Sequence, residues 1–229
     1  MYKTISKGWI CLRPRKKKNA DKRISLCENV IIDNPSEHFG NYHTLFQNTN
    51  PIHLELGSGK GSFISNLALE NPAVNFIAFE KVKDVFLMSA EKLSSLHIQN
   101  AYAICDDASH LTSFFSAGEI SRIYINFCDP WPKQKHQKRR LTNRSFLDIY
   151  RLLLPEDGSI FFKTDNRQLF EFSLNEFCAA EYHLRNITFD LHASSFQGNI
   201  MTEYEERFSS LGQPIYRLEA FVNKPVLTE

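Results

Sequence analysis

The middle of the chain places one acidic residue beside an aromatic residue and then a run of basic residues. Asp129 is followed by Pro130, Trp131 and Pro132. Because proline fixes its own φ and favours an extended backbone in the residue before it, the two prolines predict a rigid ledge with Asp129 and Trp131 extended. The next basic residues, with no acid among them, are Lys133, Lys135, Lys138, Arg139 and Arg140. A carboxylate, an aromatic face and cations for phosphate groups together favour an enzyme that acts on nucleic acid.

A glycine-rich segment, ELGSGKG, occupies residues 55–61. Its first residue is Glu55, and its glycines are Gly57, Gly59 and Gly61. Glycines allow a tight turn and let a ligand approach the backbone, and a following helix would supply free N–H groups. Glu80 ends the next predicted strand, where a carboxylate commonly binds ribose hydroxyls in a doubly wound sheet. A strand-to-helix turn without a ligand is the alternative to this nucleoside site.

Glycine spacing and the charge of Glu55 distinguish between nucleoside cofactors. The spacing is G-x-G-x-G, whereas dinucleotide binders carry G-x-G-x-x-G. Glu55 would repel a pyrophosphate but attract a sulfonium group and an ammonium group, so the segment favours S-adenosylmethionine over NAD. Asp106 and Asp107 follow the third predicted strand. Either carboxylate could accept a hydrogen bond from the adenine amine, and the other could cap a helix.

Short apolar runs alternate with amphipathic segments over most of the chain. The predicted strands are Ile52–Leu56, Val74–Phe79, Ala101–Cys105, Ile120–Phe127, Ser159–Lys163, Leu184–Leu191 and Ile215–Val222. The predicted helices are Ser62–Glu70, Val82–Leu96, Asn143–Leu154 and Gln168–Ala180. This alternation predicts an α/β fold with a doubly wound, mostly parallel sheet, and the last two strands predict an antiparallel C-terminal hairpin. We expect a basic N-terminal extension at residues 1–45 and the catalytic domain at residues 46–229.

Charge is segregated along the 229-residue chain although its net charge is only +1. Nine of the 27 Lys and Arg residues lie in residues 1–23 and six in residues 133–144, with Asp21 as the one acid in these two stretches. Such clusters predict faces that bind a polyanion. The five cysteines form no CxxC pair, which argues against a disulfide framework and a zinc site. No apolar run reaches the roughly 20 residues that span a membrane. Because the cysteine pattern indicates no zinc site and the apolar runs indicate no membrane span, we expect a cytoplasmic protein without metal.

Several motifs together resemble the bacterial tRNA (guanine-N7-)-methyltransferase family. They are ELGSGKG at 55–61, Phe79-Glu80, NFCDPWPKQKHQKRRL at 126–141, FKTDN at 162–166 and TEYE at 202–205. Cys128 stands where similar sequences usually carry Ser. The resemblance implies the seven-stranded, Rossmann-like fold of class I S-adenosylmethionine-dependent methyltransferases. It also implies tRNA as the partner, with 7-methylguanosine at position 46 of the variable loop as the product, and it leaves open a monomer or a homodimer.

The resemblance also assigns roles to individual residues. The S-adenosylmethionine pocket would be lined by Glu55, Glu80, Asp107 and Asp129 beside the three glycines, and Asp129 would also be the catalytic residue. The substrate-contacting residues would be Lys133, Asp165, Thr202, Glu203, Tyr204 and Glu205. The RNA-binding segment would comprise Lys135, His136, Gln137, Lys138, Arg139 and Arg140.

Guanine chemistry limits what the acids need to do. N7 carries an in-plane lone pair and no proton, so it requires no general base, and we expect Asp129 and Asp165 to stabilise charge and orient the base. Trp131 could stack on a splayed base or lie in the core. Tyr204 falls in a predicted irregular segment, residues 193–213, which could equally be a loop without a ligand. Three other functions stay open: an RNA-binding scaffold, a nicotinamide-dependent oxidoreductase, and an RNA methyltransferase that deprotonates an exocyclic amine.

Overall fold

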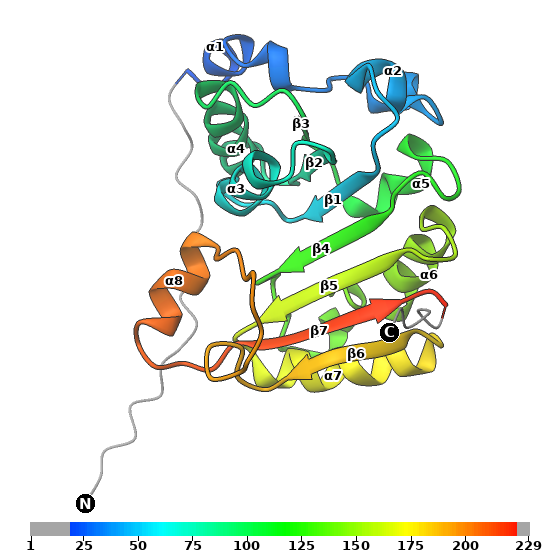
Figure 1. The fold of residues 1–229 in the computed structure, drawn as a ribbon, viewed down its shortest axis with the longest axis vertical. Coiled ribbons are helices and arrows are strands. Elements are labelled where there is room, and N and C mark those ends of the chain that lie inside the picture. The colour runs from blue at the N-terminus through cyan, green and yellow to red at the C-terminus, as the bar shows by residue number, and fades with distance from the viewer. Residues whose placement is uncertain (1–18, 224–229) are drawn as a thin grey trace, which may run out of the picture.

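The computed structural model describes residues 19–223, which are built around one seven-stranded sheet (Figure 1). Its strands are β1 (Ile52–Leu56), β2 (Asn75–Phe79), β3 (Ala101–Ile104), β4 (Arg122–Asn126), β5 (Ser159–Thr164), β6 (His183–Thr188) and β7 (Tyr216–Phe221). Their spatial order is β3-β2-β1-β4-β5-β7-β6. Neighbours from β3 to β5 pair in parallel, and β7 runs antiparallel to both β5 and β6. The predicted α/β fold with an antiparallel C-terminal hairpin is confirmed.

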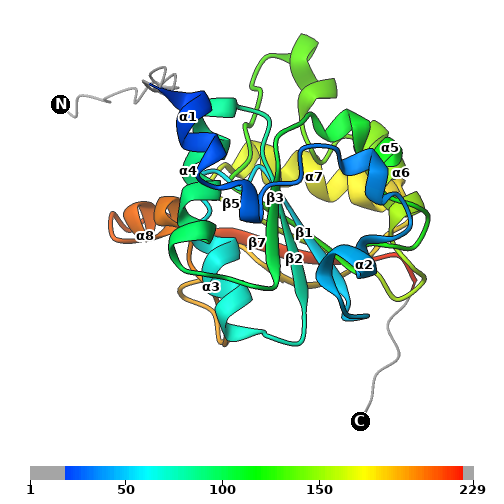
Figure 2. The same cartoon turned by 90° about the horizontal axis from the view of Figure 1, so that it is seen from above.

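Helices cover both faces of this sheet (Figures 1 and 2). The helices α3 (Ser62–Glu70) and α4 (Lys83–Ser95) pack on β2 and β3 through one hydrophobic cluster. On the opposite face lie α5 (Leu111–Phe114), α6 (Arg144–Leu153) and α7 (Arg167–Ala179), whose buried side chains join a second and larger cluster. The helices α3, α4, α6 and α7 were predicted because their apolar residues recur on one side, as Leu147, Tyr150 and Leu153 do in α6, whereas the four-residue helix α5 was not.

The chain before β1 packs on the same core. It contains α1 (Ala20–Ser25) and α2 (Tyr42–Phe46). The guanidinium of Arg23 pairs with the Glu91 carboxylate of α4 at 2.7 Å, and the N–H of Ile32 donates to the carbonyl of Ala103 on β3. The described part of the predicted N-terminal extension therefore lies against the sheet edge. The basic cluster Arg15–Lys18 lies outside the described residues. No helix within residues 19–223 is long and apolar enough to cross a membrane.

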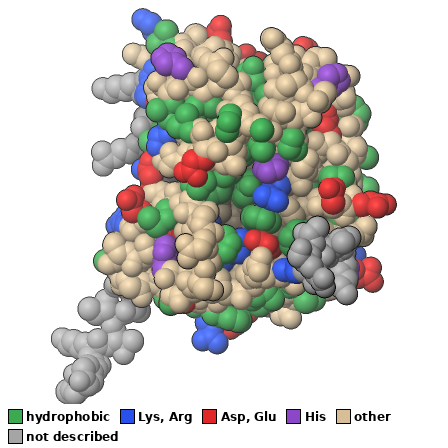
Figure 3. All heavy atoms as spheres, viewed as in Figure 1, with side chains coloured by type: hydrophobic (Ala, Val, Ile, Leu, Met, Phe, Trp, Pro, Cys, Tyr) green, Lys and Arg blue, Asp and Glu red, His purple; other side chains and the backbone are tan. Residues whose placement is uncertain are grey.

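No helix layer covers the middle of β4, β5 and β7 on the face turned toward the viewer in Figure 1. This face carries polar side chains, and Arg122 lies over the Phe161 ring at 4.1 Å. A cavity of about 280 Å³ lies there, lined in part by His53, Arg122, Phe161 and Arg217. The same side of the molecule is hollowed in Figure 3, where acidic and basic side chains are interspersed without an extended patch of either sign.

Four α-helices within residues 19–223 were not predicted: α1, α2, α5 and α8. The segment 193–213 was expected to be irregular, but the structure contains α8 (Glu203–Ser209) within it. Thr202 is the N-cap, because its hydroxyl accepts a hydrogen bond from the N–H of Glu205 at 2.9 Å. The sequence signal was present, since Thr followed three residues later by Glu is a helix-start pattern.

Candidate active site

The predicted acids emerge along one edge of the sheet. Glu55 lies at the end of β1, Glu80 follows β2, and Asp106 follows β3 by two residues. Asp129 and Asp165 follow β4 and β5. Because these five strands are neighbours and run parallel, their carboxyl ends meet at the same edge, on both sides of the point where the strand order reverses. Residues far apart in the sequence are thus brought to one edge of the sheet.

The glycine segment forms the turn between β1 and α3. Gly57, Gly59 and Gly61 have φ of 75°, 59° and 80°, values that L side chains rarely adopt. A Cβ at Gly61 would also lie 2.6 Å from the Ser89 hydroxyl, so this glycine lets α3 approach α4. At Gly57 an added Cβ would meet nothing within 4 Å, which leaves the backbone open to a ligand.

Glu55 is a buried carboxyl group with one unsatisfied oxygen. Glu55 is only 2% exposed, and its Oε1 accepts a hydrogen bond from the Asn126 amide at 3.1 Å. Its Oε2 has no hydrogen-bond partner in the described structure. Burial raises the pKa of Glu55 to about 8. A cationic donor placed against Oε2 would satisfy that oxygen and favour the ionised form.

Glu80 joins the glycine turn to the second strand. Its Oε2 accepts from the N–H of Gly59 at 3.1 Å, and its Oε1 accepts from the N–H of Val82 at 2.9 Å. Burial raises the pKa of Glu80, these backbone N–H groups oppose the rise, and the charge of nearby Asp129 adds to it. Each oxygen keeps a lone pair, so the carboxylate can still accept from hydroxyl groups of a ligand.

The two acids after β3 have different contacts. Asp107 caps a short 3-10 helix through Ser109, and its other oxygen pairs with Lys81. Burial would raise the pKa of Asp107, but these partners outweigh it and hold the pKa at about 2. Asp106 uses its Oδ1 to accept from the N–H of Asp107 and to contact His110. The structure therefore gives the helix cap to Asp107.

The ledge after β4 differs from its predicted geometry. Phe127 and Trp131 both have positive φ, 51° and 40°, whereas Trp131 was expected to be extended. The reason lies in later residues: Arg140 donates to the carbonyls of Pro130 and Trp131 at 2.9 and 3.1 Å. Arg140 is only 6% exposed and is therefore part of the interior, although it ends the basic run.

The other basic residues of the run are displayed on the surface. Exposed cations lie on and beside the 3-10 helix η4 (Gln134–Arg139): Lys133, Lys135, Lys138 and Arg139. Within the described residues none of these four forms an ion pair. The His136 ring contacts the half-buried Trp131 ring edge-on, with centroids 5.7 Å apart, and Gln137 is also half-buried. Figure 2 shows this green segment projecting from the body of the molecule, on the side away from α3.

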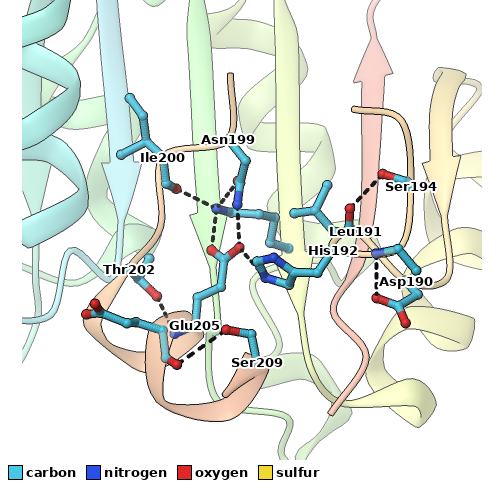
Figure 4. A network of polar contacts seen from close by, with 12 residues as sticks. Asp190, Leu191, His192, Ser194, Asn199, Ile200, Thr202, Glu205 and Ser209 are labelled. Atoms are coloured by element: carbon cyan, nitrogen blue, oxygen red, sulfur yellow. Dashed lines mark hydrogen bonds and ion pairs between the residues drawn. The ribbon is translucent and has the colours of Figure 1, made fainter. Parts of the chain in front are cut away.

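A buried ion pair fastens α8 to the sheet (Figure 4). Lys163 of β5 donates to Glu205 Oε2 at 2.7 Å and to the carbonyl of Ile200 at 2.9 Å. The second oxygen of Glu205 accepts from the Asn199 amide at 2.6 Å and lies 3.2 Å from His192 Nε2. Glu205 is fully buried, so its carboxylate points into the protein and holds the helix that carries Tyr204.

The exposed start of α8 reaches across to the glycine turn. Glu203 contacts Lys60 at 2.7 Å, the Ser62 hydroxyl at 2.6 Å and Lys92 at 3.0 Å. Hydrogen bonds from Lys60 and Ser62 lower the pKa of Glu203 to about 2. The Tyr204 hydroxyl donates a long hydrogen bond of 3.5 Å to Asp165. Burial raises the pKa of Asp165. The centroid of the Tyr204 ring lies 5.1 Å from that of the Phe127 ring.

These elements enclose a cleft of about 350 Å³. Its lining residues come from the glycine turn, the end of β4 and α8: Glu55, Gly57, Ser58, Gly59, Lys60, Ser62, Phe63, Asn126, Phe127, Thr202, Glu203, Tyr204 and Arg207. Sequence reasoning missed Asn126 and Lys163, which hold Glu55 and Glu205. Both are polar residues at the ends of otherwise apolar strands, and that was the available signal.

Comparisons with known proteins show the family to which the sequence is similar. A family model described as "Putative methyltransferase" matches residues 49–218. Two curated relatives, from Streptococcus pyogenes serotypes M18 and M6, are each 48% identical over 91% of this chain and 99% of their own length. Both are named tRNA (guanine-N(7)-)-methyltransferase.

Solved structures share the fold at low sequence identity. The 16S rRNA methyltransferase KamB has a TM-score of 0.62 at 12% identity, over 81% of this chain and 94% of its own. A SAM-dependent methyltransferase from Aquifex aeolicus has a TM-score of 0.55 at 11% identity, over 90% of this chain and 100% of its own. Since the family model and the curated relatives both cover most of the sequence, the chain belongs to the tRNA (guanine-N(7)-)-methyltransferase family.

Proposed function

We propose that the protein transfers a methyl group from S-adenosylmethionine to N7 of guanosine in the variable loop of tRNA. The observation that carries the donor assignment is the carboxyl group of Glu55, a residue that lines the cleft and whose buried Oε2 has no hydrogen-bond partner among the described residues. The ammonium group of an amino-acid moiety would supply the missing hydrogen bonds. The name shared by relatives at 48% identity supports guanine in tRNA as the acceptor.

The donor would lie along the sheet edge from β1 to β3. Glu55 would hold its ammonium group, the backbone of Gly57 and Gly59 would line its middle, and Glu80 would accept from the ribose hydroxyls. Asp107 caps the 3-10 helix and pairs with Lys81, whereas the Oδ2 of Asp106 accepts no hydrogen bond among the described residues, so we assign the adenine amine to Asp106. When bound, S-adenosylmethionine supplies an electrophilic methyl group on a sulfonium.

The protein's contribution to transfer would be orientation and charge placement. Guanine N7 uses its own lone pair, so no side chain has to remove a proton before transfer. Positive charge moves from the sulfonium to the purine, and the carboxylates of Asp129 and Asp165 would stabilise the purine and accept from its N1–H and amino group. The rings of Phe127 and Tyr204 flank the cleft and would restrict the angle at which the base enters.

The exposed cations of the projecting loop would contact RNA phosphates. Lys133, Lys135, Lys138 and Arg139 are exposed and form no ion pair within residues 19–223. Arg144, four residues after the basic run 133–140, is instead paired with Asp148 at 2.7 Å. Of the six basic residues in the stretch 133–144, four are therefore expected to contact phosphate groups. A tRNA substrate and cysteines without a metal-binding or disulfide pattern support a cytoplasmic location.

The proposal is tested by incubating the protein with unmodified tRNA and labelled S-adenosylmethionine and then separating the nucleosides by mass spectrometry. Label in 7-methylguanosine is expected. Label in N2-methylguanosine or N6-methyladenosine would replace the acceptor by an exocyclic amine. Binding of tRNA without any transferred label would favour the RNA-binding scaffold.

A further inference from the structure

Arg140 is the last residue of the basic run 133–140, but its side chain forms hydrogen bonds with the backbone of its own loop. Its Nε–H donates to the carbonyl of Pro130 at 2.9 Å, and its Nη2 donates to the carbonyl of Trp131 at 3.1 Å. Its guanidinium lies over the Phe172 ring of α7 at 4.3 Å. Since the residue is 6% exposed and has these contacts, it is not available to a phosphate group at the surface.

These contacts close the loop that starts at the ledge. Pro130 and Trp131 are the residues directly after Asp129, and Arg140 follows η4 at the other end. The side chains between the two ends fold onto Trp131, whose ring is contacted by His136 at 5.7 Å and lies under the Arg139 guanidinium at 5.0 Å. Arg140 thus fixes the distance between the predicted catalytic carboxylate and the exposed cations on η4.

The conformation that Arg140 holds is one the chain does not favour locally. Trp131 has a φ of 40°, and Pro132 disfavours such a backbone in the residue before it. A bulky residue with positive φ persists only where surrounding contacts over-determine it. In this conformation the carbonyl oxygens of Pro130 and Trp131 both accept hydrogen bonds from Arg140. Without them the ledge is expected to relax toward the extended form.

We infer that Arg140 is a positioning residue: it holds the Asp129 ledge in its strained conformation and thereby places the carboxylate for methyl transfer. The catalytic consequence rests on the proposed function, whereas the conformational consequence does not. The other residues of the basic run contact RNA, so Arg140 and Arg139, although adjacent and of one type, act in different ways.

Arg151 offers a matched control. Like Arg140 it donates from a guanidinium to a backbone carbonyl, that of Ala180 at 2.6 Å, and lies over an aromatic ring, that of Tyr182 at 4.5 Å. It has no contact with the ledge. Arg140→Met, Arg140→Lys and Arg151→Met are compared with the wild type after thermal unfolding has shown that each is folded. If Arg140→Met does not fold, Arg140→Lys carries the test, because lysine keeps the charge but cannot donate in the same two directions.

Turnover is the first readout. Arg140→Met is expected to lower kcat roughly ten- to hundred-fold, as a misplaced catalytic group does. The KM for tRNA should change by less than about threefold, because no phosphate contact is removed. The salt dependence of tRNA binding should stay as in the wild type. Arg151→Met should leave kcat unchanged. An Arg140 variant that raises KM and lowers the salt dependence, with kcat retained, would make Arg140 an RNA contact and overturn the inference.

Fluorescence of Trp131 is the second readout and needs no RNA. The chain has two tryptophans, so Trp9→Phe leaves Trp131 as the one emitter. In this background Arg140→Met and Arg140→Lys are expected to shift the emission to longer wavelength as the ring leaves its contacts, and Arg151→Met is not. Unchanged emission in both Arg140 variants would show that Arg140 does not hold the ledge. If the wild type does not methylate tRNA, the proposed function fails, and this spectrum alone decides the inference.

Discussion

Lys163 Nζ lies 2.7 Å from Glu205 Oε2 between a central strand and α8, and the two residues are 5% and 0% exposed. The pair joins a residue of the FKTDN motif at 162–166 to one of the TEYE motif at 202–205. Sequence reasoning assigned Glu205 to substrate contact, but its carboxylate faces the protein interior. Its contribution to the site is to hold the helix from which Glu203 and Tyr204 reach the cleft.

Removal of one partner of this ion pair should release α8. Lys163→Met leaves a buried carboxylate without its cation, which typically destabilises a fold by about 3–5 kcal/mol. We expect faster proteolysis within residues 189–215 and a lower free energy of unfolding in denaturant. The double variant Lys163→Met/Glu205→Leu should recover part of this loss, because no buried charge is left unpaired. A single variant as stable and protease-resistant as the wild type would contradict the role given to the pair.

The pKa of Glu55 predicts a pH dependence in the protein without donor. Because burial raises this pKa from 4.5 to about 8, the stabilising contribution of the neutral group is complete at low pH. It is lost as the pH rises through the folded-state pKa. The difference in unfolding free energy between wild type and Glu55→Gln should therefore fall between about pH 5 and 8. Parallel curves for the two proteins would show that Glu55 does not titrate in this range.

The same group should couple donor binding to proton release. An ammonium group favours the ionised carboxylate, so S-adenosylhomocysteine should bind more tightly as the pH rises from about 6 to 8. Calorimetry in buffers of different ionisation enthalpy should detect protons released by the wild type. Glu55→Gln should release fewer and bind more weakly. Equal proton release from both proteins would remove Glu55 from the donor site.

Salt should weaken tRNA binding to a degree set by four exposed cations. Four contacts to single-strand-like RNA predict a slope of about −3 in a plot of log affinity against log salt. Lys138→Gln should reduce that slope by about 0.7, because one phosphate contact is lost. Arg144→Gln is the matched control, since Arg144 is already paired with Asp148. If Arg144→Gln changed the slope as much as Lys138→Gln, the division between exposed and paired cations would be wrong.

Glu203 should slow the exchange of donor and product. Its carboxylate bridges α8 to Lys60, Ser62 and Lys92 at the edge of the cleft. Glu203→Gln should speed dissociation of S-adenosylhomocysteine roughly two- to fivefold, the range expected from exposed ion pairs. Stopped-flow dissociation measures this rate. Glu206→Gln, an exposed acid on the same helix without an ion pair in the described chain, is the control, and equal rates for the two variants would exclude the bridge as a gate.

The sheet was predictable because its strands are short apolar runs that alternate with amphipathic helices. The range predicted for α3 is the observed one, and β1 begins and ends as expected. The strand-end acids were predictable for the same reason, since parallel strands bring their carboxyl ends together. The start of α8 was encoded in the Thr202–Glu205 spacing but was not recognised.

Contacts between distant residues were not predictable from local patterns. Asn126 and Glu55 are 71 positions apart, and Lys163 and Glu205 are 42 apart. Nor does a run of basic residues reveal which member is buried: Arg140 and Arg139 differ only in the direction that the loop gives them. The positive φ of Trp131 follows from Arg140 and opposes the preference that Pro132 imposes.

The most direct test of the account uses tRNA in which the target guanosine is replaced by 7-deazaguanosine. This base keeps the N1–H and amino group but has a carbon in place of N7. The account predicts that the modified tRNA binds like unmodified tRNA and competes with it, and that it receives no methyl group from labelled S-adenosylmethionine. Transfer of label to the modified tRNA at the wild-type rate would show that the acceptor is another atom and would contradict the account.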